Sequence, residues 1–183
     1  MNRDDAIALL HRYVSSDALR KHCYATAAVM KQIGAYLGED AERWEVIGIL
    51  HDIDYELVGE DMQRHGVEGY RILRENGVDE EIAKIVKGHN HFLHGPSYET
   101  PVEIALQAAD SVSGLVIACA LVKGGVVSDV TPKTVKKKYK EKSFAAGCDR
   151  SRIALIESLM DRQTLYELSI AGIVSIREEL GLR

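Results

Sequence analysis

Apolar residues recur at spacings of three and four along most of the chain, and alternating apolar and polar runs are nearly absent. This spacing puts apolar side chains on one face of an α-helix, so it predicts an all-α fold. Two of the three prolines, Pro101 and Pro132, each follow a threonine. A Thr-Pro pair is typical of an N-cap and the first helical residue, so we expect helices to begin at both positions.

The pattern predicts helices joined by short connections. We expect them over about residues 4–14, 16–38, 40–50, 63–76, 79–88, 101–122 and 132–142, with one or two more between 151 and 180. A chain of 183 residues fits one domain. We expect a helical-bundle core over about 17–122 and a C-terminal helical extension over about 131–183.

Composition restricts the partners of the chain. Its net charge is −5 and its pI about 5.8, which argues against a nucleic-acid partner held through phosphate contacts. No apolar run approaches the roughly 18 residues of a membrane span, and the N-terminal MNRDDAIALL carries acids where a signal peptide is basic. The three separated cysteines form no CxxC pair. We expect a cytoplasmic protein with reduced thiols and no membrane partner.

Two histidines point toward the expected core. His22 lies three residues after Leu19 and four before Thr26, on the apolar face of its helix. His51 follows Ile47 by four residues and also points inward. A single inward histidine is more often a hydrogen-bonded core residue than a metal ligand. The two histidines therefore indicate a metal site only in combination with other ligand residues.

Two aspartates complete the cluster. Asp52 follows His51 directly, and both can reach one ion near the helix end. Asp110 lies in the apolar segment EIALQAADSVSGLVIACAL, where a buried carboxylate needs a cation or another partner. Imidazole and carboxylate together suit iron, manganese, cobalt, nickel or zinc. The lack of thiolate ligands argues against a closed structural zinc site.

A histidine, an HD pair about 30 residues later and an aspartate in a QAADS context resemble the HD-domain superfamily of metal-dependent phosphohydrolases. The segments SVSGLVIACALVKGG and TVKKKYKEKSFAAG are similar to a subgroup of small bacterial HD-domain hydrolases. The resemblance implies an HD-domain helical bundle with His22, His51, Asp52 and Asp110 as metal ligands. It names a reaction class and no substrate.

Two further histidines extend this resemblance. His65 begins HGVEGY and His89 lies in KGHNH. In two-metal HD proteins, histidines in these contexts bind a second ion and the HD aspartate, here Asp52, bridges the two ions. The chain departs from the HD-GYP proteins, because Asn90 follows His89 where they have a second histidine. His91 is an alternative to His89.

Acids follow the HD pair. Asp54 and Glu56, together with Asp52, are the candidate catalytic residues, as general acid or base or by orienting a water molecule. For Asp54 and Glu56 the alternative is a solvated loop acid. HD-type 5′-deoxynucleotidases also have acids after HD, which keeps a nucleoside monophosphate open as substrate.

Many HD proteins have Gly-Lys where this chain has Asp54-Tyr55. The lysine that would bind substrate phosphate is therefore missing. Lys133 or Lys137, from the basic segment KTVKKKYKEK, could replace it. The alternative is a solvated lysine face, which is the usual role of a charge run.

Together these features predict a phosphohydrolase that uses one or two divalent transition-metal ions. We expect its partner to be a small phosphate ester, either a phosphomonoester or a phosphoanhydride, with a nucleotide favoured. The alternative is an HD-fold regulatory module that binds a nucleotide without turnover. The intact set of ligand residues favours the enzyme. The sequence does not indicate the oligomeric state.

Overall fold

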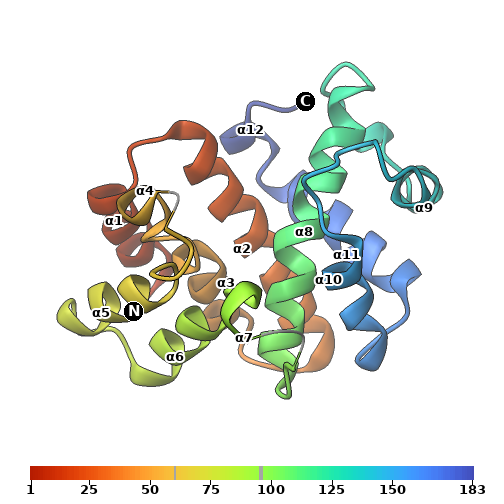
Figure 1. Cartoon of the computed structure of the whole chain (residues 1–183). Coiled ribbons are helices and arrows are strands. Elements are labelled where there is room, and N and C mark those ends of the chain that lie inside the picture. The colour runs from red at the N-terminus through yellow and green to blue at the C-terminus, as the bar shows by residue number, and fades with distance from the viewer. Residues whose placement is uncertain (60, 95–96) are drawn as a thin grey trace.

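The computed structural model describes residues 1–59, 61–94 and 97–183 (Figure 1). These residues form helices and no strand, which confirms the all-α prediction. The helices are α1 (Arg3–Tyr13), α2 (Asp17–Leu37), α3 (Ala41–Leu50), α4 (Tyr55–Val58), α5 (Val67–Glu75), α6 (Glu80–Gly88), α7 (His91–His94), α8 (Pro101–Leu121), α9 (Pro132–Lys140), α10 (Arg150–Ala154), α11 (Arg162–Ser175) and α12 (Arg177–Leu180), with the 3₁₀ turns Val127–Asp129 and Leu155–Ser158.

Helices α8 and α9 begin at the two Thr-Pro pairs. Thr100 and Glu103 form a capping box around Pro101, the first residue of α8. The Thr131 side chain accepts a hydrogen bond from the Thr134 amide at the start of α9. Both Thr-Pro predictions are therefore confirmed.

One boundary was wrong. The fourth helix was expected from about residue 63, but α5 begins at Val67. The residues before it form turns that end at Gly66, whose φ of +82° is incompatible with a right-handed helix. The turn presents His65 and the Gly66 amide to the interior, where both contact the Asp54 side chain.

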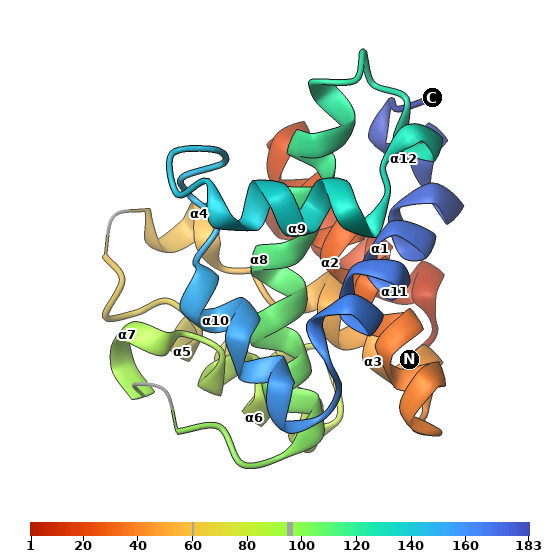
Figure 2. The ribbon, with the colours of Figure 1, turned by 90° about the vertical axis from the view of Figure 1, so that its right-hand side faces the viewer.

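The two longest helices, α2 and α8, pack against each other at the centre (Figure 1). Around this pair, α3 and α11 pack against α2, and α10, α11 and α9 pack against α8. Figure 2 shows α9 lying across α8 on the side opposite the N-terminal helices. Helices from the N-terminal, central and C-terminal parts of the chain thus pack around α2 and α8.

Helix α8 is long and apolar enough to cross a membrane by length and composition, with a mean hydropathy of 1.7 over an 18-residue window. The prediction that no stretch approaches this length is therefore wrong for α8. Its apolar character has another cause, since 72% of that window is buried inside the fold. A core helix contacted on all sides is apolar all round.

A missing side chain allows α3 to approach α2. A β-carbon at Gly48 would lie 2.5 Å from the Ala27 Cα, closer than two carbon atoms can pack. Gly48 lies three residues before His51, and its carbonyl accepts a hydrogen bond from the His51 ring. The close approach therefore brings the HD pair against the helix that carries His22.

We predict that Gly48→Ala destabilises the protein by about 1–3 kcal/mol, because the added methyl group must push α2 and α3 apart. Gly88→Ala is the matched control: it lies in α6, and a β-carbon there meets no atom within 4 Å. The control should change the free energy of unfolding by less than about 0.5 kcal/mol. Urea unfolding measures both, and equal effects would show that the contact is not tight.

Candidate metal centre

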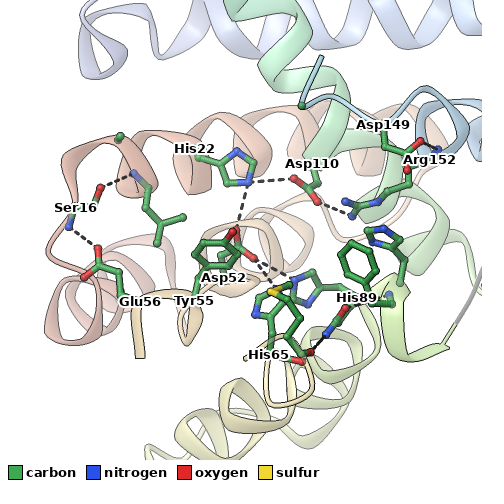
Figure 3. Close-up of a pocket in the computed structure, with 17 residues that line it drawn as sticks. Ser16, His22, Asp52, Tyr55, Glu56, His65, His89, Asp110, Asp149 and Arg152 are labelled. Atoms are coloured by element: carbon green, nitrogen blue, oxygen red, sulfur yellow. Dashed lines mark hydrogen bonds and ion pairs between the residues drawn. The ribbon is translucent and has the colours of Figure 1, made fainter. Parts of the chain in front are cut away.

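Side chains from three packed segments converge on one site (Figure 3). His22 comes from α2, Asp110 from α8, and His51 and Asp52 stand where α3 ends. The His22 Nε2 atom lies 3.1 Å from Asp110 Oδ1, 3.2 Å from His51 Nε2 and 3.5 Å from Asp52 Oδ2. The structure thus places all four residues around a common point.

A second pair of histidines faces the same aspartate from the other side. His65 Nε2 lies 3.4 Å and His89 Nε2 3.2 Å from Asp52 Oδ1, whereas Asp52 Oδ2 lies 3.4 Å from His51 Nε2. Each carboxylate oxygen of Asp52 therefore faces its own pair of imidazoles. Two groups of donors result, His22–His51–Asp52 and Asp52–His65–His89, and each is compact enough to hold an ion.

The Nδ1 atoms of His51 and His89 form hydrogen bonds that leave their Nε2 atoms available to bind a metal. His51 Nδ1 lies 2.8 Å from the Gly48 carbonyl and His89 Nδ1 2.5 Å from the Val86 carbonyl. A carbonyl only accepts, so both Nδ1 atoms carry the proton and both Nε2 lone pairs face inward. Inward lone pairs beside carboxylates require a cation or a proton between them. The donor set, imidazole and carboxylate without thiolate, suits the transition metals expected from the sequence.

Asp54 is fully buried behind His65. Its Oδ1 lies 2.9 Å from His65 Nδ1, and its Oδ2 accepts hydrogen bonds from the Gly66 and Gly69 amides, both 2.7 Å long. A β-carbon at Gly69 would lie 3.3 Å from the Asp54 carboxylate, so the absent side chain permits this contact. The glycines of HGVEGY therefore hold Asp54, and Asp54 orients His65. Its carboxylate is not free for proton transfer.

Glu56 lies at the mouth of the pocket, away from the histidines (Figure 3). Its carboxylate accepts hydrogen bonds from the Ser15 amide, the Ser15 hydroxyl and the Ser16 amide. These bonds lower the pKa of Glu56, starting with the one from the Ser15 amide. Both oxygens serve the N-terminus of α2, which is a structural use of the side chain.

The positively charged side chain paired with Asp110 is that of Arg152, a residue that the sequence analysis did not identify. Arg152 of α10 places Nη2 2.5 Å from Asp110 Oδ2 and donates from Nε to Gln107 Oε1 at 2.6 Å. Lys133 and Lys137 instead line a separate pocket on α9, which shares no residue with the cluster. The expectation that they bind phosphate here is corrected: α9 turns Val135 into the core and so points these lysines outward. The burial of Asp110 was the only sequence signal for a cation such as Arg152.

The cluster forms the floor of a pocket of about 750 Å³. Arg152 and Asp149 line one wall, and the exposed rings of Tyr55 and Phe92 line the mouth. His91 also faces the pocket, but its ring packs against Phe92 at 4.1 Å between centroids and stands apart from both donor groups. His89, rather than His91, therefore joins Asp52.

Charge pairing sets the protonation of the outer histidines. Burial alone would lower the pKa of His22, but the hydrogen bond to Asp110 and the nearby carboxylate charges raise it to about 9. His65 behaves alike: burial is outweighed by its bonds to Asp52 and Asp54, and its pKa rises to about 9. Without metal, protons on these rings occupy the space between the donors.

The inner histidine and the carboxylates shift the other way. Burial dominates at His51 and lowers its pKa to about 4. Burial would raise the pKa of Asp52 and Asp110, but the surrounding histidines outweigh it, together with Arg152 at Asp110. Both carboxylates therefore titrate below their usual range and offer charged oxygens at neutral pH.

Comparison with known proteins agrees with this geometry. The family model for the HD domain matches residues 19–115, more than half of the chain. Ribonuclease Y of Fusobacterium nucleatum is 29% identical over 92 residues, and Ribonuclease Y of Lawsonia intracellularis is 30% identical over 98 residues. These matches cover 50% and 51% of this chain but only 18% of each relative, so the chain spans under a fifth of their length.

We predict that the metal-free protein loses stability as pH rises from about 6.5 to 9. The pKa values of His22 and His65 are raised in the folded state, so their contribution is complete below the unfolded value near 6.5 and is lost as pH rises through about 9. His51 stays neutral across this window because its pKa is about 4. Metal affinity should rise over the same window, since an ion must displace these protons.

Urea unfolding of chelator-treated protein at pH 6.5, 7.5, 8.5 and 9.5 measures the first effect, and calorimetry in buffers of different ionisation enthalpy counts the protons that metal releases. His22→Gln should make the stability slope less steep, because glutamine does not titrate and only the His65 contribution remains. A slope that is the same in wild type and His22→Gln would contradict the assigned role of His22.

Proposed function

The chain belongs to the HD domain family of metal-dependent phosphohydrolases, and we propose that it hydrolyses a phosphomonoester or phosphoanhydride of a nucleotide. The observation that carries this proposal is the combination found in one pocket. Two groups of metal donors share Asp52 at its floor, an arginine stands in its wall and two exposed aromatic rings stand at its mouth. The donor groups would hold the metal ions, the arginine would bind the phosphate and the aromatic rings would stack on the base.

We assign the first ion to His22, His51, Asp52 and Asp110, and a second ion to His65 and His89 with Asp52 between them. A bound divalent ion lowers the pKa of its water and acts as a Lewis acid on phosphoryl oxygens. The protein contributes fixed donors. His51 and His89 are oriented by carbonyls of their own helices and His65 is oriented by Asp54, so Asp54 is a positioning residue.

Arg152 would bind the substrate phosphate. One side of its guanidinium pairs with Asp110 and Gln107, and the residue also lines the pocket. A guanidinium offers five donors in a fixed plane, which leaves some for phosphate oxygens. Held against Asp110, it lies beside the expected metal position and takes over the task of the lysine that many HD proteins carry after the HD pair.

The mouth of the pocket supports a nucleotide. The Phe92 side chain is 68% exposed and Tyr55 43% exposed, although both are large aromatic residues. A volume of about 750 Å³ lies within the range of small-molecule sites. Aromatic rings stack on any nucleobase and contribute about 1–3 kcal/mol per base.

A second candidate is hydrolysis of an RNA phosphodiester, because both relatives bear the name Ribonuclease Y. Net charge disfavours it, since the chain carries −5 and its pocket is lined by one arginine among four acids, Asp52, Glu56, Asp110 and Asp149. Of these acids, Asp52 and Asp110 lie with the metal donors, whereas Glu56 and Asp149 would face a long polyanion that extends beyond the pocket.

The decisive experiment is metal analysis of the purified protein followed by assays with added manganese, cobalt or nickel. Three substrates separate the bond types: p-nitrophenyl phosphate and nucleoside monophosphates, nucleoside triphosphates, and a short single-stranded RNA. Chelator-sensitive release of phosphate from the first two classes is the expected result. Cleavage of RNA alone would establish the second candidate, and nucleotide binding without turnover under any metal would establish a regulatory module.

We predict that Asp52→Ala lowers kcat by more than about 100-fold, because loss of a residue that merely orients a ligand already costs about 10–100-fold. The fold should survive, because without the Asp52 carboxylate the neighbouring rings of His22 and His65 can lose their protons and no unpaired charge is left buried. Asp61→Ala is the matched control, as Asp61 is exposed and does not line the pocket. Wild-type turnover in Asp52→Ala, at equal stability, would make the HD pair structural.

We predict that Phe92→Ala raises the KM for a nucleoside monophosphate about tenfold through loss of base stacking. The KM for a small phosphate ester without an aromatic ring, such as glycerol phosphate, should change less than twofold. Leu57→Ala, which removes a 51% exposed apolar side chain outside the pocket, controls for general surface effects. Equal increases in KM for both substrates would show that the nucleobase does not stack on Phe92.

A further inference from the structure

Positive charge is concentrated in one short segment of an acidic chain. Residues 123–142 contain seven of the eleven lysines and two acids, a net of +5, whereas the whole chain carries −5. The other residues therefore carry −10. The proposed phosphohydrolase site uses none of this charge, because the lysines of α9 lie outside its pocket.

The fold turns these lysines outward together. Helix α9 buries Val135 completely, and its Tyr139 hydroxyl donates to the Arg150 carbonyl, so the apolar edge of the helix faces α8 and α11. Lys133, Lys136, Lys137 and Lys140 are exposed. Among the described residues, these four lysines form no ion pair, whereas the lysine between them, Lys138, pairs with Glu141.

An exposed apolar pair adjoins the lysines. Leu121 is 61% and Val122 63% exposed at the end of α8, and both are large aliphatic residues. Val122 and Lys123 line one groove with Lys133, Lys136 and Lys137. Figure 2 shows α9 lying across α8 below the turn where α8 ends. We call this surface, made of Leu121, Val122, Lys123 and the outward lysines of α9, the lysine face.

We propose that the lysine face docks the protein on an anionic lipid bilayer, with Leu121 and Val122 entering the interface and the lysines contacting acidic headgroups. Lysines around exposed aliphatic side chains are the combination found in peripheral membrane surfaces. The sequence-based expectation of no membrane partner rested on spanning segments and a signal peptide, and surface docking needs neither.

Three features favour a bilayer over nucleic acid. The exposed cations of the face are all lysines, whereas phosphodiester recognition favours arginine for its bidentate geometry. Tyr139 lines a neighbouring hollow with Lys136 and Lys140, but the guanidinium of Arg162 lies over its ring and its hydroxyl donates to the Arg150 carbonyl, so the ring is not free to stack on a base. Two adjacent aliphatic side chains gain nothing from a phosphate backbone, but they gain free energy in a lipid interface.

The test is co-sedimentation of the full chain with vesicles of phosphatidylcholine alone or with 30% phosphatidylserine. We expect binding to the acidic vesicles only, weakening as salt rises from 50 to 300 mM. Lys133→Gln with Lys137→Gln should weaken binding at least tenfold, from roughly fivefold per lysine. The matched double variant Lys21→Gln with Lys84→Gln removes the same charge from other surfaces and should change binding less than twofold.

The apolar part is tested separately. Leu121→Ser with Val122→Ser keeps every charge and should weaken vesicle binding at least fivefold, and because both side chains are exposed the fold should keep its melting temperature. Equal binding by the two lysine double variants would overturn the proposal. So would binding of a single-stranded oligonucleotide by the lysine face in the absence of vesicle binding, which would make it a nucleic-acid surface.

Discussion

The burial of one carboxylate, that of Asp52, organises the centre of this protein. A charged carboxylate removed from water requires compensating cations and hydrogen bonds. Its two oxygens meet four imidazoles, from α2, the end of α3, the turn before α5 and the end of α6. Each of these segments must therefore be held at hydrogen-bond distance from a single residue.

Small residues and fixed caps provide that precision. Gly48 lets α3 lie against Ala27 of α2, and the turn at Gly66 delivers both His65 and an amide to Asp54. The carbonyls of Gly48 and Val86, each three residues before a histidine, then fix the rings of His51 and His89. The site is thus built largely from local backbone geometry, and the long helices only bring these pieces together.

This division explains what could be predicted from the sequence. Helix periodicity and the Thr-Pro caps identified the helices, because such signals are local. The convergence of His22, His51, Asp52 and Asp110 was predicted from the resemblance to the HD-domain pattern, since each residue alone could equally have been a hydrogen-bonded core residue. Arg152 and the orientation of α9 depend on how α10 and α9 pack against α8, and no local pattern encodes that packing. The sequence therefore left the lysine run open between a solvated face and a phosphate site, and only the packing of α9 places it outside the pocket.

The C-terminal part does more than cover the core. The HD match ends at residue 115, yet Arg152 completes the charge balance of Asp110 from beyond it. Arg150 donates to the Ala145 and Cys148 carbonyls and so holds the segment that places Gly147 and Asp149 in the pocket wall. This segment begins where the lysine helix ends, so α9 and the pocket wall are directly connected along the chain. We therefore expect the C-terminal residues to contribute the phosphate contact through Arg152, while the HD core supplies the metal ligands and the aromatic rings at the mouth of the pocket.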